Sequence, residues 1–124
     1  MSPAPAPESS FVHLDIAQSL QNVGDATALD DLLRMLHDVL ERDLPQITQH
    51  MEVHDFPAAQ QLLHALKGCV PIFCGPELCD ELLAVEQLSK SASPQAAAAA
   101  YGPLREKLQT LQCEIAVQVS PPQA

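Results

Sequence analysis

Apolar residues recur at intervals of three and four along most of this chain, which is the spacing that places them on one side of an α-helix. The longest such stretch covers residues 26–52, and further stretches cover residues 13–22, 56–73, 76–89 and 94–119. The sequence therefore predicts an all-α protein, an antiparallel four-helix bundle with a short extra N-terminal helix.

The buried stripe of each expected helix follows from the same spacing. In the first helix we expect four buried residues: Leu14, Ile16, Ala17 and Leu20. In the second, the stripe consists of Leu29, Leu32, Leu33, Leu36, Val39 or Leu40, Leu44, Ile47 and Met51. The fourth uses Leu78, Leu82, Val85 and either Leu88 or Ser89, and the last uses Leu104, Leu108, Leu111 and Ile115.

Capping residues and prolines predict where the helices begin and end. Asp25 and Asp55 are good N-caps, and Pro57 suits a first turn. Pro45 either bends one long helix or divides it into two at residue 44, and Gly102-Pro103 presents the same choice in the last helix. Pro71 kinks or shortens the end of the third helix, which we expect near Phe73, and Gly75-Pro76 starts the fourth.

The third helix carries the most informative residues on its polar side. Ala59, Leu62, Leu63, Leu66, Cys69, Val70 and Phe73 fall on one side, and Gln60, Gln61, His64, Lys67, Gly68 and Pro71 fall on the other. We therefore expect His64 in water, with Lys67 as a surface neighbour. Gly68, one turn later, costs roughly 1 kcal/mol relative to alanine and leaves open space beside the imidazole. This arrangement suits an imidazole that carries an anionic group and is reached by another protein.

The segment His64-Ala65-Leu66-Lys67-Gly68 resembles the H-x-L-K-G core of the histidine-containing phosphotransfer (HPt) domain of bacterial two-component phosphorelays. Leu14-Asp15, Gly24-Asp25, Asp43-Leu44-Pro45, Leu78 and Val85-Glu86 extend the resemblance over about residues 11–117. Residues 11–119 are accordingly expected to form the helical domain. Residues 1–10 read as a Pro/Ala-rich flexible tail or linker, and residues 120–124 as a frayed end.

The resemblance implies a phosphorelay carrier and not an enzyme. His64 would accept a phosphoryl group from the aspartyl phosphate of a receiver domain and pass it to another receiver. Lys67 would stabilise the phosphoryl group, Gly68 would leave space for it, and Gln61 would orient the ring. The partners implied are response-regulator receiver domains and a hybrid sensor histidine kinase. The chain would need no cofactor of its own, because the receiver carries Mg²⁺. Either Glu86 or Gln87 would face the site from the next helix, where the family often has Gln.

Composition narrows the classes of partner. The net charge of −10 argues against nucleic acid and against anionic membranes, and no apolar run approaches the roughly 20 residues that span a bilayer. The first ten residues lack the features of a signal peptide, so we expect a cytoplasmic, monomeric protein with reduced thiols. Ile72, beside the polar side of the third helix, suggests docking through local apolar contacts.

Two other functions are consistent with parts of the sequence. A helical module of the same shape would bind receiver domains without being phosphorylated. A Cys/His metal or redox protein would use the cysteines at 69, 74, 79 and 113, but their spacing is not typical of zinc sites, and buried structural thiols are the expected role. His13, His37, His50 and His54 lack supporting residues and are interpreted as solvated.

Overall fold

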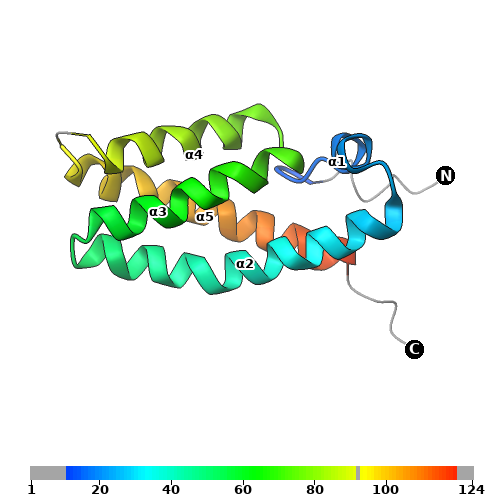
Figure 1. Ribbon diagram of the computed structural model, residues 1–124, viewed down its shortest axis with the longest axis horizontal. Coiled ribbons are helices and arrows are strands. Elements are labelled where there is room, and N and C mark those ends of the chain that lie inside the picture. Colours follow the sequence, from blue (N-terminus) through cyan, green and yellow to red (C-terminus); the bar gives the residue numbers. More distant parts are fainter. Residues whose placement is uncertain (1–10, 92, 120–124) are drawn as a thin grey trace.

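A computed structural model describes residues 11–91 and 93–119 of the chain. The expected N-terminal tail and frayed C-terminus lie outside these residues. The described part contains α1 (Ile16–Val23), α2 (Ala26–Glu52), α3 (Phe56–Cys69), the 3₁₀ turn η2 (Val70–Ile72), α4 (Pro76–Ser89) and α5 (Gln95–Val119). The helices α2 to α5 form the antiparallel bundle, and α1 lies at one end of it beside the end of α3 (Figure 1). The predicted fold class is confirmed.

The predicted caps form as expected. The Asp25 carboxylate accepts a hydrogen bond from the backbone N–H of Ala28 at 2.8 Å, and the Asp55 carboxylate accepts one from Ala58 at 3.3 Å. Both bonds use backbone donors that the first turn of a helix leaves free. The αL conformation of Gly24, with φ of 88°, ends α1 and allows α2 to begin immediately.

Both helices with internal prolines are continuous. Pro45 lies inside α2 and Pro103 inside α5, so the single-helix alternative is correct at both places. Near Pro45, the Leu44 carbonyl accepts a hydrogen bond from Thr48 Oγ1 at 2.9 Å and another from the Tyr101 hydroxyl at 3.1 Å. The bond from Tyr101 ties the proline-containing part of α2 to α5, and the bond from Thr48 stays within α2.

The first helix differs most from the prediction. It begins at Ile16 and not at residue 13, because Asp15 caps it. Leu14 is buried just before the helix, where it pairs with Cys74 in an isolated antiparallel bridge. Ala17 and Leu20, both expected to be buried, are exposed, and Ser19 is the buried residue of α1. The reason is that α1 attaches to the bundle largely through backbone and polar groups, beside the apolar contacts of Ile16 and Val23, and apolar periodicity does not report such groups.

The end of the third helix also differs. The α-helix ends at Cys69, four residues before the expected Phe73, and continues as η2. Pro71 explains this, because its nitrogen has no hydrogen to donate to a carbonyl one turn earlier.

The core is otherwise built from the predicted stripes, with a few changes of position. Leu32 is exposed although the spacing places it inside, and Leu40 rather than Val39 is fully buried. In α4, Ser89 is buried and Leu88 only half-buried. The remaining core is aliphatic apart from two phenylalanines and one tyrosine: Phe56, Phe73 and Tyr101.

Candidate functional site

The polar side of α3 lies in water where the sequence predicts it. Leu63 and Leu66 are completely buried against the bundle, whereas the side chain of His64 is 62% exposed. An ideal Cβ built on Gly68 would meet no atom within 4 Å, so the glycine leaves open space one turn after the imidazole. His64 is therefore accessible to a partner, and the space beside it is free.

A buried carboxylate from α4 lies beside the imidazole. Glu86 is 0% exposed, and its Oε2 atom is 3.5 Å from His64 Nδ1. Its neighbour Gln87 is exposed. The sequence left Glu86 and Gln87 open as the residue facing His64, and the geometry selects Glu86.

Three further polar side chains surround the same carboxylate. Gln60 Nε2 donates a hydrogen bond to Oε2 at 2.6 Å. Lys90 Nζ lies 3.3 Å from Oε2, and Lys67 Nζ lies 3.6 Å from Oε1. The cluster thus sets two ammonium groups against one carboxylate, which gives a locally positive site on a chain of net charge −10.

The surroundings of Glu86 keep it ionised. Burial raises the pKa of its carboxyl, but the hydrogen bonds from Gln60 and Lys90 and the charges of Lys67 and Lys90 lower it by more, so the pKa lies below its ordinary value. A permanent negative charge therefore faces the Nδ1 side of the imidazole at neutral pH.

Lys67 is only loosely held by this carboxylate. The Oε1 atom of Glu86 is buried and accepts no hydrogen bond from any described residue, although Lys67 Nζ is 3.6 Å away. The Lys67 side chain remains 32% exposed. Its ammonium can therefore turn toward an anion bound at His64 with little loss of existing contacts.

Sequence reasoning missed two members of the cluster. Gln60 precedes His64 by four residues, and Lys90 follows Glu86 by four, so each shares a helix face with another member of the cluster. The sequence favoured Gln61 instead. That residue is exposed, and its side chain makes no hydrogen bond or ion pair with the described residues. The spacing of four from Glu86 is a signal that could have identified Lys90, whereas nothing within α3 distinguishes Gln60 from Gln61.

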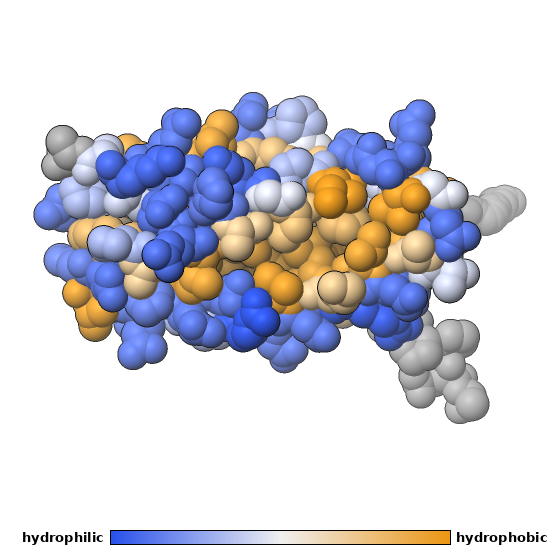
Figure 2. Space-filling model, in the orientation of Figure 1, coloured by the Kyte–Doolittle hydropathy of each residue, from blue (hydrophilic) through white to orange (hydrophobic). Residues whose placement is uncertain are grey.

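An apolar surface lies at the end of the bundle that carries α1. Figure 2 shows it over the region where α1, α2 and the end of α3 meet, while hydrophilic side chains cover much of the opposite half of this view. The exposed large apolar residues of α2 and η2 include Leu32, Met35 and Ile72, with Met35 60% exposed. Ile72 follows His64 by eight residues, about two helical turns. We call these three residues the apolar docking surface.

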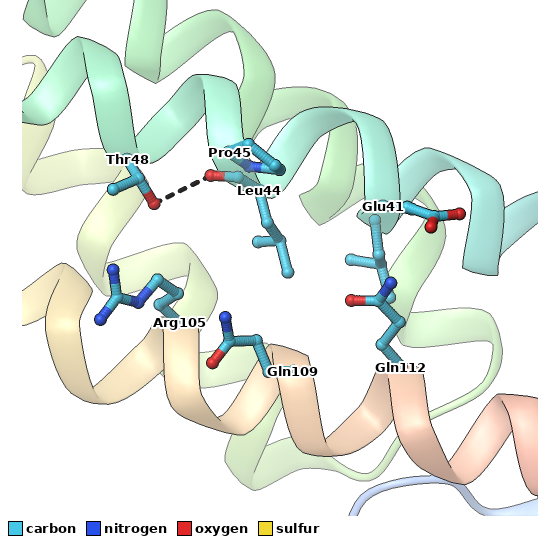
Figure 3. Close-up of a pocket in the computed structure, with 8 residues that line it drawn as sticks. Glu41, Leu44, Pro45, Thr48, Arg105, Gln109 and Gln112 are labelled. Carbon is cyan, nitrogen blue, oxygen red and sulfur yellow. Dashed lines mark hydrogen bonds between the residues drawn. The ribbon is translucent and has the colours of Figure 1, made fainter.

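A cavity between two helices lies away from the imidazole. It has a volume of about 470 Å³ and lies between α2 and α5, lined by Leu40, Glu41, Leu44, Pro45, Thr48, Arg105, Gln109 and Gln112 (Figure 3). None of these residues belongs to α3 or α4, which carry His64 and Glu86. The cavity is therefore separate from the cluster.

The cysteines and the other histidines form no comparable cluster in the described part of the chain. All four thiols are free, and Cys113 is exposed, contrary to the expectation of burial. Burial raises the pKa of the Cys69, Cys74 and Cys79 thiols, which makes them less reactive. His37 lies close to the carboxylates of Asp38 and Glu41 on the surface of α2, and we assign no metal to this group.

Comparison with known families adds one finding. The family model described as "Hpt domain" matches residues 31–114, a range that contains both His64 and Glu86. No curated protein and no solved structure matches the chain. Among the described residues, no helix combines the length and the apolar character needed to cross a membrane.

Proposed function

Because this chain belongs to the Hpt domain family, whose members carry phosphoryl groups in phosphorelays, we propose that His64 is its phosphoacceptor. Hpt domains bind receiver domains and are phosphoryl carriers, not enzymes. The observation that supports the proposal best is the exposed His64 imidazole with its Nδ1 atom 3.5 Å from the buried carboxylate of Glu86.

The position of the Glu86 carboxylate determines which nitrogen of the His64 ring reacts. A neutral imidazole carries its proton on one nitrogen and a lone pair on the other. Since an ionised Glu86 faces Nδ1, the favoured tautomer carries the proton on Nδ1 and leaves the lone pair on Nε2. Nε2 is therefore the nucleophile. This is the same use of a carboxylate to orient a histidine that hydrolytic triads make.

The transfer exchanges one bond to phosphorus for another. The Nε2 lone pair forms the N–P bond while the bond from phosphorus to the aspartyl oxygen of the receiver breaks, and the electrons of that bond remain on the aspartate. The Nδ1 proton stays in place, so the ring becomes a cation that the Glu86 carboxylate stabilises. A second receiver reverses the step, and its aspartate attacks phosphorus as the N–P bond breaks. In this proposal the receivers hold the Mg²⁺.

The two lysines offset the charge that the phosphoryl group brings. A carboxylate near a phosphoryl group would repel it, but Glu86 lies on the Nδ1 side of the ring, away from Nε2. Lys67, loosely held and partly exposed, is the group best able to reach the phosphoryl oxygens. Lys90 lies 3.3 Å from Oε2 of Glu86, the oxygen that is also close to His64. The open space at Gly68 accommodates the phosphoryl group and the receiver loop that delivers it. Gln61, the exposed residue one turn before His64, remains a candidate orienting group through contacts that form only in the complex.

Receivers would bind through the apolar docking surface. Leu32, Met35 and Ile72 provide exposed apolar area on a chain that is otherwise strongly acidic. We therefore expect burial of apolar area, and not overall charge complementarity, to provide most of the affinity. We propose that the donor receiver belongs to a hybrid sensor kinase and that the acceptor is a response regulator, and that both use this surface in turn.

Transfer from an isolated phosphorylated receiver tests the proposal. We expect the chain to acquire an acid-labile, alkali-stable label that disappears in His64→Gln and persists in His50→Gln, a matched control for a histidine elsewhere in the bundle. Wild-type chain that binds the receiver but gains no label would support the alternative function, a docking module that is not phosphorylated. Label that persists in His64→Gln would disprove the assignment of His64.

A further inference from the structure

Glu114 is a buried acid that the phosphoryl chemistry does not use. It lies on α5 and is only 8% exposed. Its carboxylate accepts hydrogen bonds from the backbone N–H groups of three consecutive residues, namely Val12 at 2.5 Å, His13 at 3.1 Å and Leu14 at 2.9 Å. Val12 bonds to Oε2, and the other two bond to Oε1. Burial of a charge is unfavourable unless it is hydrogen-bonded, and here three donors from a distant part of the chain fulfil that need.

The segment that Glu114 holds leads directly into α1, and the rest of the attachment of α1 is also polar. The Asp15 N–H donates to the Phe73 carbonyl at 2.9 Å. Gln18 Nε2 donates to the carbonyls of Pro71 and Cys74, each at 3.1 Å, and Asn22 Nδ2 donates to that of Ile72 at 2.9 Å. Within α1 the buried residue is a serine.

An element attached in this way opens more easily than the bundle. Local stability follows the amount of buried apolar contact, and α1 has little compared with α2 to α5. Its docked position depends on the apolar contacts of Leu14, Ile16 and Val23 and on a small number of hydrogen bonds, of which those to Glu114 are the strongest type because the acceptor is charged. Losing the bonds to Glu114 would loosen α1 while the packing of α2 to α5 stays in place.

The position of α1 matters for binding because α1 borders the apolar docking surface. Ile72 of η2 is a member of that surface, and the Asn22 side chain of α1 donates a hydrogen bond to the Ile72 carbonyl. We propose that Glu114 is a positioning residue for receiver docking, which holds residues 12–14, and through them α1, where Asn22 fixes the position of Ile72. This inference rests on the proposed function, because it assumes that receivers bind there.

A glutamine cannot replace this glutamate. A carboxylate offers two acceptor oxygens, whereas an amide offers one oxygen and an NH₂ group that is only a donor. In Glu114→Gln, the NH₂ group must face a backbone N–H of residues 12–14, so at least one of the three bonds is lost. The matched control is Glu106→Gln, the same change at an exposed position of α5.

The experiment measures three properties of the full chain. In Glu114→Gln we expect amide hydrogen exchange in α1 to be about tenfold faster, the increase for losing roughly 1.4 kcal/mol of hydrogen bonding to a charged group. We expect the receiver concentration that half-saturates transfer to rise about threefold or more, because fewer molecules have α1 docked. Labelling of His64 by phosphoramidate, a small donor that needs no docking, should stay at the wild-type rate. Glu106→Gln should match wild type in all three.

Two results would overturn the inference. One is unchanged exchange in α1, which would mean that Glu114 does not hold the helix. The other is faster exchange with an unchanged half-saturating concentration, which would mean that docking does not use α1. If Glu114→Gln does not fold, the double variant Gln18→Ala/Asn22→Ala loosens α1 from the opposite side and must give the same three results. Wild-type chain that never accepts phosphate from any receiver would instead contradict the proposed function itself.

Discussion

Replacing Glu86 with glutamine should destabilise the protein at neutral pH. The Glu86 carboxylate accepts a hydrogen bond from Gln60 and lies close to the ammonium groups of Lys67 and Lys90. Hydrogen bonds to a charged group contribute about 1.5–3 kcal/mol, and the amide keeps part of this. We therefore expect the free energy of unfolding to fall by about 1.5 kcal/mol, which lowers the melting temperature by about 6 °C for a chain of this size.

The difference in stability between wild type and Glu86→Gln should become smaller as the pH falls. The pKa of Glu86 is lower in the folded protein than its ordinary value of 4.5, so its ionised form favours folding. The stabilisation is complete above pH 4.5 and disappears as the pH falls through the lower folded value. Melting curves from pH 7 to pH 3 should thus converge, whereas Glu41→Gln, an exposed control on α2, should follow wild type throughout.

The same substitution should slow the labelling of His64 by phosphoramidate. A carboxylate 3.5 Å from an imidazolium stabilises it by about 1 kcal/mol at the dielectric constant of water and about 5 kcal/mol at an effective value of 20. Since the His64 side chain is 62% exposed, the lower value applies, and we expect a rate about five- to tenfold slower. A melting temperature equal to or above that of wild type at pH 7, or an unchanged labelling rate, would refute the role assigned to this carboxylate.

Three further substitutions test the rest of the site. Lys67→Ala should slow receiver-dependent transfer about tenfold by removing the mobile ammonium, with an unchanged circular dichroism spectrum; a loss of helical signal would contradict its surface position. Gly68→Gln should block transfer by filling the open space while helicity stays the same or rises, since glycine is the poorer helix former; a normal transfer rate would argue against the need for space. Ile72→Asp should weaken receiver binding about tenfold in calorimetry without changing phosphoramidate labelling, because a buried unpaired charge opposes docking; equal affinity would exclude the apolar docking surface.

Residues that act within their own helix were predictable from the sequence. Asp25 and Asp55 cap the helices that follow them, and the exposed side of α3 is the one that the spacing of Leu63 and Leu66 assigned to it. These features depend on backbone donors one turn away and on helical periodicity, and both can be read locally.

Residues whose partners are distant in the sequence were not predictable in this way. Leu20 has the spacing of a buried residue but is exposed, because α1 is positioned by Glu114 and by carbonyls near Pro71, which follow it by more than fifty residues. Gln60 and Glu86 come together only when α3 packs on α4, and nothing in either helix alone distinguishes Gln60 from Gln61. Where a predicted helix end was wrong, nearby glycine and proline residues kept the error to a few residues, as at the end of α3 near Pro71.

The Tyr101 ring, whose hydroxyl contacts α2, is an intrinsic optical probe of folding. The chain has one tyrosine and no tryptophan, so its near-ultraviolet absorbance and emission come almost entirely from this ring. The ring is buried between α2 and α5, and burial raises the pKa of its hydroxyl above the ordinary value of 10. Denaturation can therefore be followed without an added fluorophore. Because the ring lies on a different pair of helices from His64, its signal should respond to unfolding and stay constant when the imidazole is modified.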